Sequence, residues 1–320
     1  MVAPGFSDMH QHGQDQENYK YKVMDGVTTA LELEMGTTDI DAWYGERQGR
    51  ALINHGVSVG HIPLRMKIMK DSEGFAPVDD AAYRAASDSE IEMLKKGIEV
   101  GLNRGALGVG FGMMYTPAAS RWEILEMFRV AARKNAPCIV HMRYAGLKEP
   151  NSCITALEEV ISASAITGAT LHVVHITSLG FSFTPRMLQM IKEARSRGID
   201  VTVECYPYAA TQTAIETAVY DEGWQESLGI TYGDLQWAET GERLETIAPA
   251  FKNKGRICVG ADADITIFDP EKINDQATYE EPAKYSKGIA YVLVSGVIVV
   301  KNGKLQENIY PGKPVRGAIK

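Results

Sequence analysis

Two histidines separated by one residue, His10 and His12, end a short apolar run near the start of the chain. Side chains two positions apart in an extended strand point to the same side, so the two imidazoles can lie next to each other. Imidazole nitrogens are common ligands of zinc and related metals. The pair predicts a metal site if later strands supply further ligands, and an exposed histidine pair without a metal is the alternative.

The other histidines favour the metal site. Six of the seven histidines stand at or near the ends of strand-like runs, and only His55 does not. If these strands run parallel in one barrel, their carboxyl ends meet at one mouth, where active sites are built. A random scatter of histidines would not select this rim. The six are His10, His12, His61, His141, His172 and His175.

Apolar runs that are typical of strands alternate with amphipathic stretches that are typical of helices. This alternation predicts a parallel sheet covered by helices. Gly105, Gly168 and Gly198 follow helical stretches, as C-cap glycines do. The predicted strands are Val2–Met9, Val27–Leu33, Val57–Ile62, Ala106–Phe111, Ala136–His141, Ala169–Ile176 and Ile199–Cys205. The predicted helices include Ser89–Asn103, Arg121–Lys134, Ile154–Thr167 and Thr184–Arg197.

Seven such strands indicate an α/β fold, a closed (β/α)₈ barrel short of one strand. A doubly wound open sheet is the competing fold, but no glycine-rich phosphate loop follows the first strand. After about residue 250 the pattern changes to short β-rich pieces, and Asn302-Gly303 predicts a hairpin turn. We therefore predict a barrel at 1–250 and a small β domain at 251–320. The β-rich pieces are Arg256–Val259, Asp264–Phe268, Gly288–Val294 and Val297–Lys301.

Composition excludes several classes of protein. The 320 residues are 45% hydrophobic and carry a net charge of −8, which argues against an extended nucleic-acid-binding face. No apolar run approaches the roughly 20 residues of a membrane span, and no leader peptide is evident. The four cysteines are far apart and indicate reduced thiols in a cytoplasmic protein. Composition leaves the oligomeric state open.

Eight segments, in order, resemble the amidohydrolase superfamily and within it the D-aminoacylase family of N-acyl-D-amino-acid deacylases. Each segment is weak alone, but their order over most of the chain is specific. The resemblance implies a TIM-like (β/α)₈ metal-dependent hydrolase barrel with a small β-sandwich domain. The segments are PGFSDMHQH (4–12), DGVTTALELEMG (25–36), GHIPLR (60–65), GVGFGMMYTP (108–117), VHMR (140–143), VVHITSLG (173–180), ECYPY (204–208) and GADADITIFDP (260–270).

The resemblance also implies a ligand set. His10, His12, His141 and His175 match the family's metal-binding histidines. The family places a cysteine after the second strand, where this chain has Glu34 or Met35. A thioether is a poor zinc ligand and a carboxylate can bridge two metals, so we predict Glu34 as the fifth ligand, with Glu32 as the fallback and a rim salt bridge as the alternative role. The predicted cofactor is Zn²⁺, as one or two divalent ions.

Three further residues are candidates for substrate contacts. Arg143 lies two residues after His141 and could hold a substrate carboxylate in bidentate fashion, with pairing to a structural acid as the alternative. Tyr115 matches the tyrosine of the family's YxP turn. Tyr206 is the third candidate, although a tyrosine packed beneath the mouth would serve equally well. Of the other histidines, His61 is interpreted as a supporting residue and His172 as a residue of the barrel interior.

The chemistry implied is hydrolysis of the amide bond of a small N-acyl amino acid. A zinc ion held by imidazoles and a carboxylate lowers the pKa of bound water from 15.7 to about 7. The family resemblance points to the D-enantiomer. The leaving amine needs a proton from an acid/base group, which the family supplies as an aspartate at the end of the eighth strand. No strand-like run of 211–250 ends in an aspartate, so the catalytic residue stays unassigned.

The missing eighth strand has two explanations. A segment near 244–250 is absent from these 320 residues, together with the β-rich N-terminal lead-in that contributes strands to the family's small domain. Alternatively, the deletion is real. We favour the first, because a barrel without one strand leaves two exposed edges.

Two other functions compete with the deacylase. One is a cyclic-amide hydrolase of the same superfamily, similar to a dihydroorotase or hydantoinase. Those enzymes usually bridge their metals with a carbamylated lysine after the fourth strand, and 108–117 contains no lysine. The other is a catalytically impaired metal-binding relative that has lost the eighth strand.

Overall fold

A computed structural model of the chain describes residues 4–72, 74–206, 208, 210–238, 241–244, 263, 265–274, 276, 285 and 287–311. The chain divides into two compact units, Met1–Gly229 and Ile230–Lys320. The predicted boundary after residue 250 lies outside the described residues, and so does the predicted junction near 244–250 beyond Leu244. Both stay predictions.

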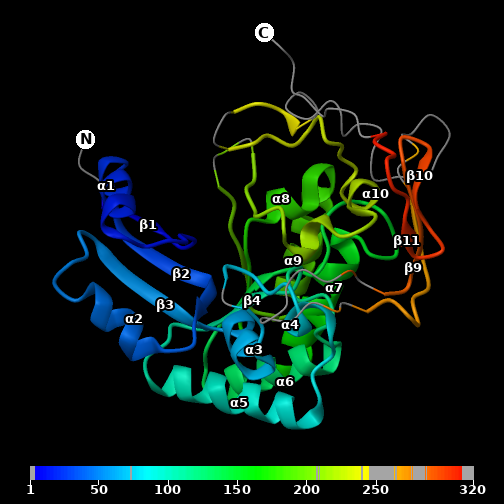
Figure 1. The fold of residues 1–320 in the computed structure, drawn as a ribbon. Helices are drawn as coiled ribbons and strands as arrows, with labels where there is room; N and C mark the ends of the chain where they lie inside the picture. The colour runs from blue at the N-terminus through cyan, green and yellow to red at the C-terminus, as the bar shows by residue number, and fades with distance from the viewer. Residues whose placement is uncertain are drawn as a thin grey trace. The chain divides into compact units, whose positions relative to one another are not determined.

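The first unit is built on a seven-stranded sheet whose strands follow one another in chain order. Every neighbouring pair is parallel. Each strand lies in or overlaps one of the seven predicted runs, and the curled sheet with its covering helices confirms the TIM-like α/β class (Figure 1). The strands are β1 (Phe6–Asp8), β2 (Val27–Thr37), β3 (Asn54–Gly60), β4 (Val109–Gly112), β5 (Cys138–His141), β6 (Leu171–Val173) and β7 (Val201–Val203).

Helices cover this sheet and connect its strands. The four predicted helices are present within one residue of their predicted ends. They are α5 (Asp88–Asn103), α6 (Arg121–Arg133), α7 (Cys153–Thr167) and α9 (Thr184–Ser196). The sequence analysis did not predict the others, which are α1 (Gln16–Met24), α2 (Ile40–Arg47), α3 (His61–Met69), α4 (Asp80–Tyr83), α8 (Ile176–Gly180) and α10 (Trp224–Leu228), with 3₁₀ turns η1 (Phe181–Phe183) and η2 (Ala218–Tyr220).

Local signals explain where the long helices begin and end. Ser87 caps α5 and exchanges hydrogen bonds with Glu90, a capping box. Ser120 and Ser152 accept backbone N–H groups at the starts of α6 and α7. Gly168 ends α7 in the left-handed conformation, with φ 74°. Two predicted strands run on into helices, which is wrong. The run Val57–Ile62 leaves the strand after Gly60, and His61 begins α3. The run Ala169–Ile176 leaves the strand after Val173, and Ile176 begins α8.

The core of the first unit lies between the sheet and its helices. The central strands β4 and β5 are buried at every position, as expected of parallel strands covered on both faces. Helices α5, α6 and α7 pack side by side (Figure 1). After β7, the described residues of this unit form no further strand, only η2 and α10. None of the described helices has the length and apolarity of a membrane span.

The second unit contains an antiparallel sheet in the order β11-β10-β9-β8. Three of its strands match the predicted pieces, while Arg256–Val259 lies outside the described residues. Asn302 and Gly303 turn the chain between β10 and β11 with φ 52° and 74°, which confirms the predicted hairpin turn. The strands are β8 (Ile265–Phe268), β9 (Ile289–Val294), β10 (Val297–Lys301) and β11 (Lys304–Leu305).

Candidate metal centre

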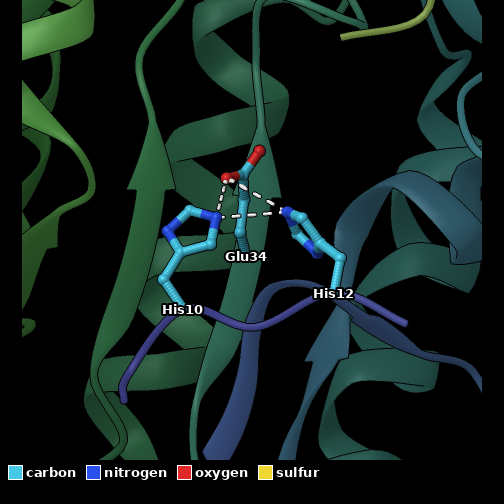
Figure 2. A group of neighbouring side chains, drawn as sticks. All are labelled: His10, His12 and Glu34. Carbon is cyan, nitrogen blue, oxygen red and sulfur yellow. Dashed lines mark hydrogen bonds and ion pairs between the residues drawn. The ribbon is translucent and has the colours of Figure 1, made fainter. Parts of the chain in front are cut away.

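His10 and His12 lie just beyond β1, and their imidazoles meet. Their Nε2 atoms are 3.1 Å apart, with the rings edge to face. Asp8 at the end of β1 accepts the backbone N–H of His10 at 3.0 Å, which fixes the start of the segment. Both rings point toward the carboxylate of Glu34 (Figure 2). The strand ends at Asp8, one residue before the predicted end at Met9, and the two imidazoles still face a common point.

Glu34 is the centre of the group. It comes from β2 and is 2% exposed. Its Oε2 lies 2.8 Å from His10 Nε2 and 3.2 Å from His175 Nε2, while its Oε1 lies 3.0 Å from His141 Nδ1. His12 Nε2 is 3.9 Å from Oε2. Glu34 therefore occupies the place between the histidines.

Two sets of three donors share this carboxylate. His10, His12 and Glu34 form one set, and Glu34, His141 and His175 form the other, with the donor atoms of each set within 4.8 Å of one another. His141 ends β5, whereas His175 follows β6 with φ 32°. A non-glycine residue in the left-handed region is unusual and is found preferentially at functional sites. The strand ends thus converge as the barrel pattern predicted.

Three of the four histidines use their second ring nitrogen for a contact outside the group. His10 Nδ1 is 2.6 Å from Glu204 Oε1, and His175 Nδ1 is 2.9 Å from Ser178 Oγ. His12 Nδ1 is 3.0 Å from both oxygens of Glu32. Glu32, the fallback ligand, therefore contacts a histidine from outside the two sets. The sequence analysis gave Glu204 no role, although its position at the end of β7 was a usable signal.

Electrostatics prepares these groups to bind a cation. Burial alone would raise the pKa of Glu34, but the imidazoles of His141, His10 and His175 hold the pKa of that carboxyl well below its usual range. Burial lowers the pKa of His141. Burial also acts to lower the pKa of His10, yet the carboxylates of Glu204 and Glu34 raise it to about 10. A cation competes with a proton for this nitrogen, so binding releases a proton.

The donor set fits a divalent transition metal. Imidazole nitrogens with one carboxylate are the ligand types of zinc, and cations such as copper and nickel accept the same donors. Four nitrogens converge on one buried carboxylate, and a buried anion of this kind needs a positive partner. We conclude that the five predicted ligands are brought together in a geometry that suits one or two divalent ions.

The three residues predicted to contact the substrate lie near the centre, but two of them already have partners within the protein. Arg143 is buried and pairs with Glu159 through two nitrogens, at 3.0 Å and 2.8 Å, and it donates to Pro117 O. This is the structural alternative considered for it. Tyr115 lies against the His141 ring, and its hydroxyl is 3.2 Å from Thr213 Oγ1.

Tyr206 lies near His175, with its ring centroid 6.3 Å from that of His175. Its hydroxyl is buried without a hydrogen-bond partner among the described residues. A buried hydroxyl normally has a partner, so this one is a candidate for a ligand contact.

His61 and His172 lie outside the two donor sets. His61 is fully buried, with its Nε2 2.7 Å from Glu123, which also pairs with Arg65. Its contact with Glu123 links α3 to α6. His172 lies in β6 with its Nδ1 2.8 Å from Thr202 Oγ1.

A cavity of about 250 Å³ opens beside His12 and Glu32. Met35, Met66 and Phe75 supply apolar surface to its lining. The Phe75 ring lies edge-on to His12, at a centroid distance of 5.6 Å. The candidate metal centre is therefore flanked by an apolar space.

Comparison with known proteins gives sequence relatives, although no protein-family profile matches the chain. An N-acyl-D-glutamate deacylase of Alcaligenes xylosoxydans xylosoxydans is 22% identical over 420 aligned positions, which cover 93% of this chain and 83% of that protein. A D-aminoacylase of the same organism is 27% identical over 68% of this chain and 49% of its own length. The chain therefore spans about half of the second relative.

Solved structures share the fold. The crystal structure of N-acyl-D-glutamate deacylase from Bordetella bronchiseptica, complexed with zinc and a phosphonate inhibitor, has a TM-score of 0.54 and 20% identity over 98% of this chain and 88% of that one. A D-aminoacylase crystal structure has a TM-score of 0.55 and 20% identity over 95% and 87%. The chain is therefore similar in sequence to proteins named N-acyl-D-glutamate deacylase and D-aminoacylase, and it shares the fold of their solved counterparts.

Proposed function

We propose that this protein is a metal-dependent amidohydrolase that cleaves the amide bond of N-acyl-D-amino acids. The observation that carries the proposal is the buried carboxylate of Glu34, shared by two sets of donors that include all four predicted ligand histidines. The relatives named N-acyl-D-glutamate deacylase and D-aminoacylase support the substrate class. We propose Zn²⁺ as the cofactor, since zinc accompanies the deacylase of the same fold.

The residues of the centre divide into metal ligands and residues that contact the substrate. His10, His12, Glu34, His141 and His175 would hold the cation or cations, and Glu34 balances their charge. A divalent cation bound there supplies Lewis acidity, which polarises an amide carbonyl and lowers the pKa of water. The unpartnered hydroxyl of Tyr206 is placed to donate a hydrogen bond to a substrate oxygen. Tyr115 limits the space beside His141.

We also propose that Arg143 binds the substrate carboxylate after it gives up one of its present contacts. The guanidinium is engaged by Glu159 and Pro117 O, so the contact requires exchange of one of these bonds. The buried pairing holds Arg143 close to the centre, two residues from His141. The free thiols of Cys138, Cys153 and Cys205 agree with the expected reducing, cytoplasmic compartment.

A second candidate, the catalytically impaired metal-binding relative, is favoured by one observation. The described residues of the first unit form no strand after β7 and so supply no strand-end aspartate there, and the leaving amine needs an acid. The cyclic-amide hydrolase is the less favoured alternative, because β4 is followed by Met113 and Met114 rather than a lysine.

One experiment separates these functions. Metal content of the purified protein is measured by inductively coupled plasma spectrometry, followed by turnover of N-acetyl-D-amino acids, their L-enantiomers and 5-substituted hydantoins. We expect one or two equivalents of divalent metal and activity confined to the D-series. Metal without turnover identifies the impaired relative, and turnover of hydantoins identifies the cyclic-amide hydrolase. Protein that binds no divalent metal refutes the proposal.

A further inference from the structure

Glu204, directly after β7, lies between two histidines and contacts both. Its Oε1 lies 2.6 Å from His10 Nδ1, and its Oε2 lies 3.5 Å from His172 Nε2. His172 is held in turn by Thr202, whose Oγ1 is 2.8 Å from His172 Nδ1. The Glu204 side chain is 18% exposed, and that of His172 is 7% exposed. The contacts form a chain from β6 and β7 to the segment after β1.

A carboxylate at Nδ1 decides which nitrogen of His10 is available. The proton stays on Nδ1, where the carboxylate accepts it, and the lone pair stays on Nε2. Nε2 is the nitrogen that lies 2.8 Å from Glu34 Oε2 and 3.1 Å from His12 Nε2. The contact also fixes the rotation of the ring. His10 lies beyond the end of β1, so the backbone hydrogen bonds between β1 and β2 do not fix its position.

We propose that Glu204, braced by His172, is the positioning residue for His10 in the donor set His10–His12–Glu34. The inference rests on the proposed function in one respect, namely that His10 binds a cation. Ser178 is the corresponding contact of His175 in the other set, and a neutral hydroxyl takes the place of the carboxylate there. Loss of Glu204 should therefore weaken metal binding by the donor set that contains His10. Loss of Ser178 should affect metal binding by the donor set that contains His175.

Metal affinity tests the proposal directly. Metal-free protein is titrated with Zn²⁺ against a competing chelator, and with Co²⁺ while its visible absorption spectrum is recorded. Glu204→Gln keeps the volume of the side chain but removes the charge that holds the Nδ1 proton. We expect the affinity for one Zn²⁺ equivalent to fall about 10- to 100-fold, as is typical for loss of an outer-sphere partner. The Co²⁺ spectrum of that equivalent changes as well.

Matched variants exclude a general loss of structure. Glu126→Gln makes the same change in an ion pair of α6 with Lys95 and Arg129, and it should leave Zn²⁺ affinity within about twofold of wild type. Ser178→Ala should alter the Co²⁺ signal of the equivalent that Glu204→Gln leaves intact. If Glu204→Gln does not fold, His172→Gln removes the brace alone, and a smaller loss of affinity in the same direction is expected.

The outcomes are distinct. If Glu204→Gln binds every Zn²⁺ equivalent with wild-type affinity, the positioning role is overturned and the proposed function is left intact. The same result in His172→Gln has the same meaning if only that variant folds. Equal losses in Glu204→Gln and Glu126→Gln overturn it too, because they indicate a general effect of lost charge. Wild-type protein that binds no Zn²⁺ overturns the proposed function and this inference together.

Discussion

Glu34 shows how one residue can decide the chemistry of this centre. The family resemblance implies a cysteine at the corresponding place, and ligand chemistry alone selected Glu34 over the neighbouring Met35. Alternation along β2 puts Glu32 and Glu34 on the same face of the strand. The structure separates them: Glu34 contacts His10, His141 and His175, while Glu32 contacts His12 from outside.

The contrast between the two glutamates is testable. Glu34→Gln removes the shared anion, so the purified protein should lose most of its bound metal. Glu32→Gln removes only an outer contact and should lower metal affinity by about 10- to 100-fold. Metal content and chelator competition measure both variants. A larger loss in Glu32→Gln than in Glu34→Gln would reverse the assignment.

The buried group of Glu123, His61 and Arg65 is a second residue-scale feature, and it concerns stability. Glu123 and Arg65 are fully buried and 2.6 Å apart. Removing one partner leaves an uncompensated buried charge, so Glu123→Gln should lower the free energy of unfolding by about 3–5 kcal/mol. Glu99→Gln, in a more exposed ion pair of α5 with Lys134, should cost less than about 1 kcal/mol. Urea unfolding monitored by circular dichroism compares the two.

The same carboxylate predicts a pH dependence. Burial alone would raise the pKa of Glu123, but His61 and Arg65 lower it in the folded protein. The contribution of a carboxyl with a lowered pKa is present above its ordinary pKa of 4.5 and is lost as the pH falls below that value. The stability difference between wild type and Glu123→Gln should therefore shrink when unfolding is measured at pH 4 rather than pH 7. A difference that grows toward acid pH would contradict this assignment.

At the scale of elements, a loop brings apolar surface to the centre. Asp71 after α3 accepts the backbone N–H groups of Val78, Asp79 and Ala81, which closes the base of this loop. Phe75 then projects between His12 and Tyr115, with ring centroids 5.6 Å and 6.3 Å away. The sequence analysis predicted no helix or strand here, and it assigned the first two residues of α3 to the end of a strand.

This loop should influence substrate choice. Phe75→Ala enlarges the apolar cavity beside His12, so kcat/KM for substrates with a long apolar acyl group should fall about tenfold, as expected when an apolar contact of about 1–3 kcal/mol is lost. Phe75→Leu keeps an apolar side chain and serves as the control. Kinetics with acyl groups of increasing length measure the effect. An equal loss for acetyl and long acyl substrates would place Phe75 outside the acyl site.

At the scale of the whole molecule, the seven-stranded sheet has two edges. Among the described strands, β1 pairs only with β2, and β7 pairs only with β6. The alignment to the N-acyl-D-glutamate deacylase extends over 420 positions, 100 more than this chain has residues. The relative therefore has extra sequence within the aligned region, and the predicted missing segment of this chain stays a prediction.

The edges predict unequal protection of the sheet. Backbone amides of β4 and β5, which are central and buried, should exchange with solvent by global unfolding, while those of β1 and β7 should exchange faster through local opening. Hydrogen exchange followed by mass spectrometry measures this order. Equal protection of β7 and β5 would indicate that another segment of the chain or a second molecule covers the β7 edge.

The sequence by itself determined the strands, the long helices and the ligand types. Apolar periodicity, serine caps and helix-ending glycines are local signals, and the strand-end histidines follow from them once parallel strands are assumed. Only the tertiary structure decided how the ends converge: that Glu34 rather than Glu32 lies between the histidines, that Glu204 reaches His10, and that Arg143 pairs with Glu159. These contacts join residues 16 to 194 positions apart, and such distances depend on packing that no local pattern encodes.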